Sequence, residues 1–225
     1  MELRVTIGNI TELETDAIVV NLFEGVKHPG GATGAVDQAL ESAITNLIED
    51  GEITGKKGTN TLIHTLGKLP AKRVIVAGLG KSDTFTVNIA REVAASTARQ
   101  LRRLKVKQAA TIVHGAGIGN IEAETAAEAL AEGTLLGLYA FKQHKTGTDA
   151  EPDKLTELLV VEQDAAKEPA IKRGVNNGRI LAESTSLARD MANQPANRMT
   201  PTIMAEHAHQ VAQDYGLEFS VLEKA

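Results

Sequence analysis

The sequence predicts an α/β fold, a three-layer sandwich with a mixed, largely parallel central sheet, on three observations. Apolar runs typical of buried strands alternate along the chain with segments whose apolar residues recur at helical spacing. Glycine-rich loops follow three of the apolar runs, where an α/β sheet passes from a strand into a helix. No repeat or low-complexity tract interrupts the alternation. Strands and helices in this order build a sheet covered by helices.

The elements of the first part of the chain follow in order from these patterns. Alternating or continuous apolar residues predict strands at 3–7, 17–23, 59–67, 73–80, 109–117 and 155–161. Apolar residues at helical spacing predict helices at 36–48, 89–104 and 122–141. We therefore expect one domain over residues 1–165.

Residues 166–225 differ in character and are expected to form a linking helix and the beginning of a second domain. A long helix is predicted over 170–194, with an apolar face too sparse to form a core alone. It should end at Gln194, because the residue before a proline is pushed out of the helical region.

A further helix should follow this break. Thr200 is suited to be its N-cap, Pro201 its first residue and Gly216 its C-terminal cap. Residues 217–222 have the pattern of a strand, the first of a sheet that this chain does not complete.

The composition excludes several kinds of site. The chain has no cysteine, so it forms no disulfide, thiolate metal site or cysteine nucleophile. A net charge of -5 and 3% aromatic residues argue against nucleic acid as a partner, and the basic residues at 99–107 are expected to be a solvated helix end. No apolar run is long enough to span a bilayer, so we expect a cytoplasmic protein without a membrane partner.

The glycine loops are the candidate ligand sites. The loop at 77–82 lacks a glycine of the Walker A motif, and the loop at 114–120 lacks the last glycine of the dinucleotide fingerprint. The loop at 28–34 leads into a helix whose first N–H groups could hold an anion, or its glycines only turn a tight corner. The residues of this candidate anion or ligand loop are Asn21, Gly30, Gly31, Gly34, Gly115 and Gly117.

No complete active site can be assembled from these residues. The six histidines are scattered, and we expect each to be solvated or at the edge of the core. His207 and His209 lie two positions apart, on different faces of one helix, and cannot share a metal. No serine lies in a nucleophile-elbow motif. We assign no catalytic residue and no metal ligand.

One segment carries a family resemblance. The sequence LARDMANQPANRMTP at 187–201 resembles the segment that begins the catalytic domain of the leucyl aminopeptidase family of cytosolic two-metal peptidases. The segments at 74–81 and 126–145 resemble a strand, loop and helix of that family's N-terminal domain. The residues that match the family signature are Asn193, Pro195, Asn197, Thr200 and Pro201.

This resemblance implies that the chain is the N-terminal regulatory or assembly domain of a longer, truncated peptidase. The full-length enzyme would remove N-terminal, preferably leucine-like residues from peptides with two divalent metals, Mn or Zn, and would form a homo-hexamer through its catalytic domain. The family's later metal-binding and lysine motifs do not occur in this sequence. We therefore expect the chain to be inactive alone.

The N-terminal domain of these peptidases also resembles the macro domain, which implies a macro-domain-like sandwich and an alternative function as an ADP-ribose or nucleotide-binding module. The segments at 8–11, 16–21 and 29–36 resemble macro-domain motifs. Two departures speak against that function. Asn9 stands where the macro domain has its adenine-binding aspartate, and residues 21–24 place bulk or a carboxylate where a sugar would lie.

Overall fold

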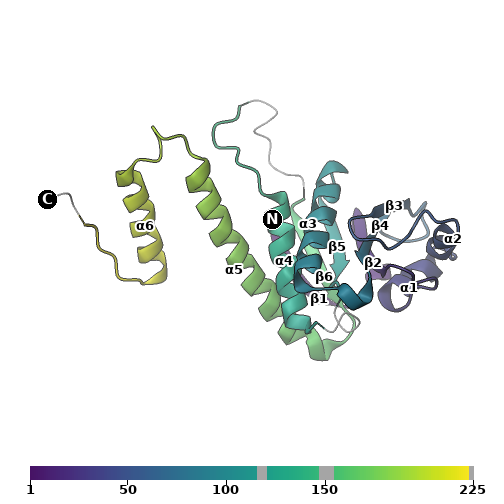
Figure 1. Cartoon of the computed structure of the whole chain (residues 1–225). Helices are drawn as coiled ribbons and strands as arrows, with labels where there is room; N and C mark the ends of the chain where they lie inside the picture. Colours follow the sequence, from purple (N-terminus) through teal and green to yellow (C-terminus); the bar gives the residue numbers. More distant parts are fainter. Residues whose placement is uncertain (116–120, 147–154, 223–225) are drawn as a thin grey trace. The chain divides into compact units, whose positions relative to one another are not determined.

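The central sheet has six strands among the residues that the computed structural model describes, 1–115, 121–146 and 155–222 (Figure 1). In spatial order they are β1 (Glu2–Ile7), β6 (Glu157–Glu162), β5 (Gln108–Ile112), β2 (Ala17–Phe23), β4 (Arg73–Gly80) and β3 (Asn60–His64). Neighbouring strands run parallel, except that β3 and β4 are antiparallel. The predicted mixed, largely parallel sheet is confirmed.

Helices cover both faces of the sheet and complete the three layers (Figure 1). One face carries α1 (Gly31–Ala39) and α2 (Ala43–Glu49), and the other carries α3 (Val87–Arg103) and α4 (Ala123–Leu138). Later in the chain come α5 (Glu168–Asn193) and α6 (Pro201–Tyr215). The short 3₁₀ helices of the described residues are η1 (Ile10–Glu12), η2 (Ser82–Thr84) and η4 (Ala165–Lys167).

Strand β2 shows why the sheet needs helices on both sides. Ile18 and Val20 belong to the core under α1 and α2, whereas Val19 and Phe23 belong to the core under α3 and α4. Successive side chains of a strand point to opposite faces, so a continuous apolar run is stable only when both faces are covered.

The predicted single helix over 36–48 is wrong, because the chain forms α1 and α2 with a break between them. Glu41 and Ser42 have φ angles of +56° and +65°, which end the first helix. The carboxylate of Asp37 accepts hydrogen bonds from the N–H groups of Ile44 at 2.8 Å and Thr45 at 3.0 Å. Asp37 therefore caps α2 from within α1, and helical spacing alone does not reveal that cap.

Helix α5 packs its first half closely on α4. A Cβ at Gly174 would meet the carbonyl oxygen of Glu124, and a Cβ at Gly178 would meet that of Glu128. Ile171 is fully buried in the core that α5 shares with α4. The two backbones approach one another only because both positions are glycines.

The described chain divides into two compact units, Met1–Glu183 and Ser184–Ala225. In the second unit, α5 ends at Asn193, and the Thr200 hydroxyl accepts a hydrogen bond from the N–H of Ile203 at 3.3 Å. Gly216 ends α6 with a φ of +65°. The predicted helix end, N-cap and C-terminal cap are confirmed.

The strand predicted at 217–222 is wrong, since those residues form no strand and belong to no sheet. The N–H of Leu217 donates to the carbonyl of Ala212 and completes the end of α6. A strand exists only when a neighbour completes its hydrogen-bond ladder, and the described residues offer none here.

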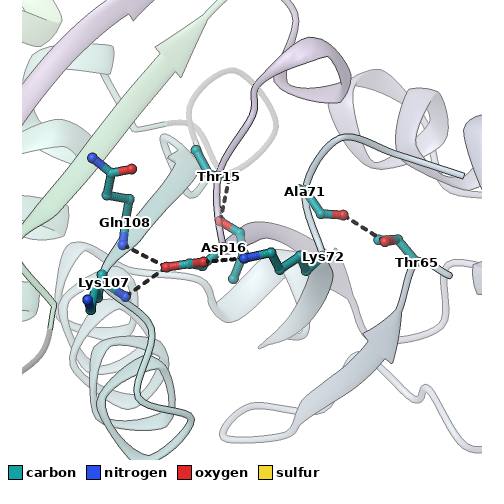
Figure 2. A network of polar contacts seen from close by, with 8 residues as sticks. Thr15, Asp16, Thr65, Ala71, Lys72, Lys107 and Gln108 are labelled. Atoms are coloured by element: carbon teal, nitrogen blue, oxygen red, sulfur yellow. Dashed lines mark hydrogen bonds and ion pairs between the residues drawn. The ribbon is translucent and has the colours of Figure 1, made fainter. Parts of the chain in front are cut away.

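The carboxylate of Asp16 links the amino ends of β2, β4 and β5 through hydrogen bonds (Figure 2). It accepts hydrogen bonds from Lys72 Nζ at 3.0 Å, the N–H of Lys107 at 3.1 Å and the N–H of Gln108 at 3.4 Å. These donors precede or begin β4 and β5, which flank β2. The Lys72 ammonium, aided by the two N–H groups, holds the pKa of the Asp16 carboxyl below its usual value.

Replacing Asp16 by Asn should lower the stability at neutral pH by about 1–2 kcal/mol, because charged hydrogen bonds weaken. The Asp16 pKa is lower in the folded protein than in the unfolded chain. Its carboxylate therefore stabilises the fold above pH ~4, and that contribution is lost as the pH falls further. Urea midpoints from pH 7 to pH 3 should decline less in D16N than in the wild type. An equal pH dependence of the urea midpoint in both proteins would contradict a stabilising role of the Asp16 carboxylate. Asp50→Asn, at an exposed position, serves as the control.

Candidate functional site

A cavity of about 240 Å³ lies at the carboxyl ends of β2, β5 and β6. The first turn of α1 and the segment from Glu162 to Lys167 form its other walls. The residues that line it are Gly8, Ile10, Asn21, Phe23, Gly30, Gly31, Ala32, Thr33, Ile112, Val113, Gly115, Val161, Glu162, Gln163 and Lys167.

The position of this cavity follows from the topology of the sheet. Strands β2 and β5 are neighbours, but the helix after β2 is α1 on one face and the helix after β5 is α4 on the other. Where the chain leaves two adjacent parallel strands toward opposite faces, a crevice opens beyond their carboxyl ends. The cavity occupies that switch point.

The structure brings together most residues of the predicted ligand loop. Asn21, Gly30, Gly31 and Gly115 all line the cavity. Gly34 lies in α1, where a Cβ would come within 2.6 Å of the Pro29 carbonyl oxygen and would disrupt the helix start. Gly117 lies outside the described residues. Whether this loop holds a ligand stays a prediction.

The start of α1 presents free hydrogen-bond donors to the cavity. Its N-cap is Gly30, which has no side chain to cap the helix. The N–H groups of Gly31, Ala32 and Thr33 donate to no acceptor among the described residues. The first hydrogen bond of the helix runs from the N–H of Gly34 to the carbonyl of Gly30, at 3.0 Å. These three N–H groups at the positive end of the helix dipole can bind an anion.

Asn21 is held in place by two contacts behind the cavity wall. Its carbonyl accepts a hydrogen bond from the Thr33 hydroxyl at 2.8 Å, and its side-chain Nδ2 lies 3.1 Å from His114 Nδ1. With Nδ2 as the donor of this contact, Nδ1 accepts and the neutral ring carries its proton on Nε2. The amide oxygen Oδ1 of Asn21 has no partner in the described part of the chain.

His114 corrects the expectation that each histidine is solvated or at the core edge. Its side chain is fully buried, and its Nε2 has no hydrogen-bond partner in the described structure. Burial lowers the pKa of His114 to about 4, so the ring is neutral at physiological pH. Sequence reasoning missed this residue because only its place directly before Gly115 hints at the site.

Glu162 and Lys167 line the opposite wall, and sequence reasoning missed both. The carboxylate oxygen Oε1 of Glu162 accepts hydrogen bonds from the N–H groups of Gln163 at 2.8 Å and Asp164 at 3.0 Å. Its second oxygen, Oε2, has no partner among the described residues. Lys167 Nζ lies 3.9 Å from an Asp164 carboxylate oxygen, which is a weak ion pair. The wall thus offers an acceptor and a donor.

The signature residues of the second unit do not belong to this cavity. They run from the last residue of α5 to the first of α6, with the middle ones in the segment between the two helices: Asn193, Pro195, Asn197, Thr200 and Pro201. In the described ranges, no three His, Cys, Asp or Glu side chains lie close enough together to hold a metal ion. Nor does any described helix have the length and apolar character to cross a membrane.

The strand order and the cavity at the switch point define a macro-domain-like α/β domain. A mutant macrodomain of Oceanobacillus iheyensis superposes with a TM-score of 0.59 at 18% identity, over 81% of this chain and 93% of that one. The N-terminal-domain model of the cytosol aminopeptidase family matches residues 19–148. The chain therefore belongs to the cytosol aminopeptidase family and contains its N-terminal domain.

Two comparisons show how much of longer proteins this chain matches. A probable cytosol aminopeptidase of Alkaliphilus metalliredigens is 36% identical over 225 residues, which are 100% of this chain and 45% of that protein. A mutant of tomato leucine aminopeptidase has a TM-score of 0.78 at 17% identity, over 96% of this chain and 43% of that one. The chain thus spans less than half the length of these relatives.

Replacing His114 by Gln should weaken the dependence of stability on pH between 6.5 and 4. In that range the unfolded chain binds a proton at His114 and the folded protein does not, so acid favours unfolding. The free energy of unfolding of the wild type should fall by about 3 kcal/mol across this pH range through His114 alone.

Urea unfolding at pH 7, 6 and 5 measures how the free energy of unfolding depends on pH. His64→Gln, at an exposed position, should keep the wild-type slope, and an unchanged slope in H114Q would contradict burial of a neutral ring.

Proposed function

We propose that this chain is the N-terminal regulatory or assembly domain of a leucyl aminopeptidase, with the beginning of the catalytic domain attached. The full-length enzyme would remove N-terminal, preferably leucine-like residues from peptides in the cytoplasm with two divalent metals, Mn or Zn. Its catalytic domains would assemble a homo-hexamer. The observation that carries this proposal is the match of the whole chain to less than half of a cytosol aminopeptidase.

The domain division proposed is 1–165 for the macro-like domain and 166–225 for the linking helix and the start of the catalytic domain. The exposed apolar side chains of α6 and the residues after it support the second part. In α6 only Ala212 is buried, while Met204, Tyr215 and Leu217 are each at least half exposed. An apolar surface of this kind requires a partner, and the rest of the catalytic domain is the partner we propose.

The chain alone should not hydrolyse leucine p-nitroanilide with Mn²⁺ or Zn²⁺. A two-metal site needs several carboxylates converging on both cations, and the described residues contain no such group. A chimaera that continues this chain with the remainder of the Alkaliphilus metalliredigens relative is the matched positive control and should turn over the substrate. Metal-dependent turnover by the 225-residue chain itself would contradict the proposal.

The alternative function is a macro-domain-like module that binds ADP-ribose or a nucleotide, and the cavity at the switch point is the observation in its favour. Three features oppose it. The ring of Phe23 lines the cavity, Glu162 places a carboxylate there, and the side chain of Asn9 is engaged with the N–H of Thr11 at 3.1 Å. Glu24 is not among the lining residues.

Calorimetric titration separates this alternative from the first proposal. We expect no saturable heat from ADP-ribose at micromolar concentrations, because a charged hydrogen bond to adenine is absent and Glu162 repels a diphosphate. The matched variant is Asn9→Asp, which restores a charged carboxylate at this position and should strengthen any residual binding. Micromolar binding by the unmodified chain would favour the macro-like module.

A further inference from the structure

We propose that the outer edge of β3 is an interaction surface at which a second copy of this chain adds its own β3, so that one sheet continues across both copies. The contact would be antiparallel and two-fold symmetric, with Leu62 of each copy at its centre. This inference concerns the sheet of the first unit and does not depend on the peptidase assignment.

β3 lies last in the strand order, and β4 is its only strand neighbour in the described part of the chain. The ladder between the two strands is antiparallel and uninterrupted along the whole length of β3. A hydrogen bond flanks each end of this ladder. The N–H of Gly78 donates to the carbonyl of Thr59 at 2.8 Å, and the N–H of Thr65 donates to that of Lys72 at 3.2 Å. These two bonds fix which residues of β3 bond to β4.

Alternate residues of β3 turn their backbone groups away from the sheet. In an antiparallel pair, residues that exchange hydrogen bonds with the neighbour alternate with residues that do not. Thr59 and Thr65 belong to bonded pairs, so the residues that face outward are Asn60, Leu62 and His64. Within the described structure, no group outside the sheet bonds to their N–H and C=O groups. The edge is therefore open.

This edge has none of the features that keep sheet edges from pairing. Such edges are protected by charged side chains, proline or a bulge. The sequence of β3, NTLIH, contains no Lys, Arg, Asp, Glu or Pro, and its register with β4 has no bulge. The opposite edge of the same sheet is β1, which carries Glu2 and Arg4. Of these two edges, that of β3 is the one suited to pairing.

The outward groups of β3 are complementary to those of a second β3. In an antiparallel pair with a two-fold axis at Leu62, the Leu62 residues of the two copies exchange hydrogen bonds, and Asn60 of each copy pairs with His64 of the other. Every outward N–H and C=O group of the strand then has a partner. Because the outward residues are symmetric about Leu62, a second copy fits this edge better than an unrelated extended peptide.

Leu66, in the turn directly after β3, is a separate observation at the same surface. Its side chain is 88% exposed, and no other large apolar side chain described in the first unit is as much as half exposed. Its φ of +51° precedes a φ of +88° at Gly67, a conformation that Asn or Gly adopts with less strain than Leu. A partner that covers this turn accounts for an exposed and strained leucine.

Sedimentation equilibrium of the 225-residue chain from about 5 to about 500 µM tests the proposal, and we expect a monomer–dimer equilibrium. His64→Pro removes an outward N–H from each copy, and edge strands tolerate proline at such positions. It should raise the dissociation constant at least about tenfold. His64→Gln is the matched control, since it replaces the same side chain but keeps the N–H, and it should dimerise like the wild type. An amide NMR spectrum verifies that each variant is folded.

Two leucine variants separate the edge of β3 from the exposed apolar surface of the second unit. Leu66→Asn should raise the dissociation constant at least about threefold. It should not lower the stability of the monomer, because Asn adopts a positive φ more readily than Leu. Leu222→Asn, at an exposed position of the second unit, should leave the dissociation constant unchanged.

Amide hydrogen exchange reports on the contact itself. The N–H of Leu62 should exchange at least about tenfold more slowly at concentrations where the chain is dimeric than where it is monomeric. A monomer over the whole concentration range, wild-type association by folded H64P, or an N–H of Leu62 that stays unprotected in a dimer would each overturn the proposal. None of these results bears on the peptidase assignment, which the turnover of the chimaera tests separately.

Discussion

The alignment of β2 between β5 and β4 is the constraint on which the rest of the first unit depends. At the amino ends of these strands, one carboxylate, that of Asp16, accepts hydrogen bonds from the segments that begin both neighbours (Figure 2). Along the strands, the side chains of β2 fill two separate cores. Because β2, β5 and β6 run parallel, their carboxyl ends reach one edge of the sheet together and form the floor of the cavity.

The cavity combines polar groups that are free with polar groups that are fully engaged. The N–H groups at the start of α1 and the oxygens of Asn21 and Glu162 remain available, whereas their neighbouring atoms are held by His114 and by the N–H groups of Gln163 and Asp164. Engaged neighbours restrict the motion of the free groups. A ligand would therefore lose little free energy to ordering the site, which is the physical meaning of a preorganised pocket.

The two compact units differ in how well they satisfy their own apolar surface. The first unit buries its aliphatic side chains on both faces of the sheet, and α5 approaches α4 through two glycines. The second unit leaves large apolar side chains exposed on α6 and after it. The two units therefore differ in how much apolar surface they leave exposed to solvent.

The local features of this protein could be predicted from its sequence. Apolar periodicity predicted the sheet and most helices, the prolines predicted the end of α5, and Thr200 and Gly216 predicted the limits of α6, because each depends on residues close in the chain. Three other features became visible only once the chain was folded. Two of them are contacts that folding brings together: the Asp37 cap of α2 and the contact between His114 and Asn21. The third is the segment at 217–222, which forms no strand because no described segment pairs with it. Sequence patterns report the spacing of residues along the chain, whereas a hydrogen-bond partner from another element has no signal in that spacing.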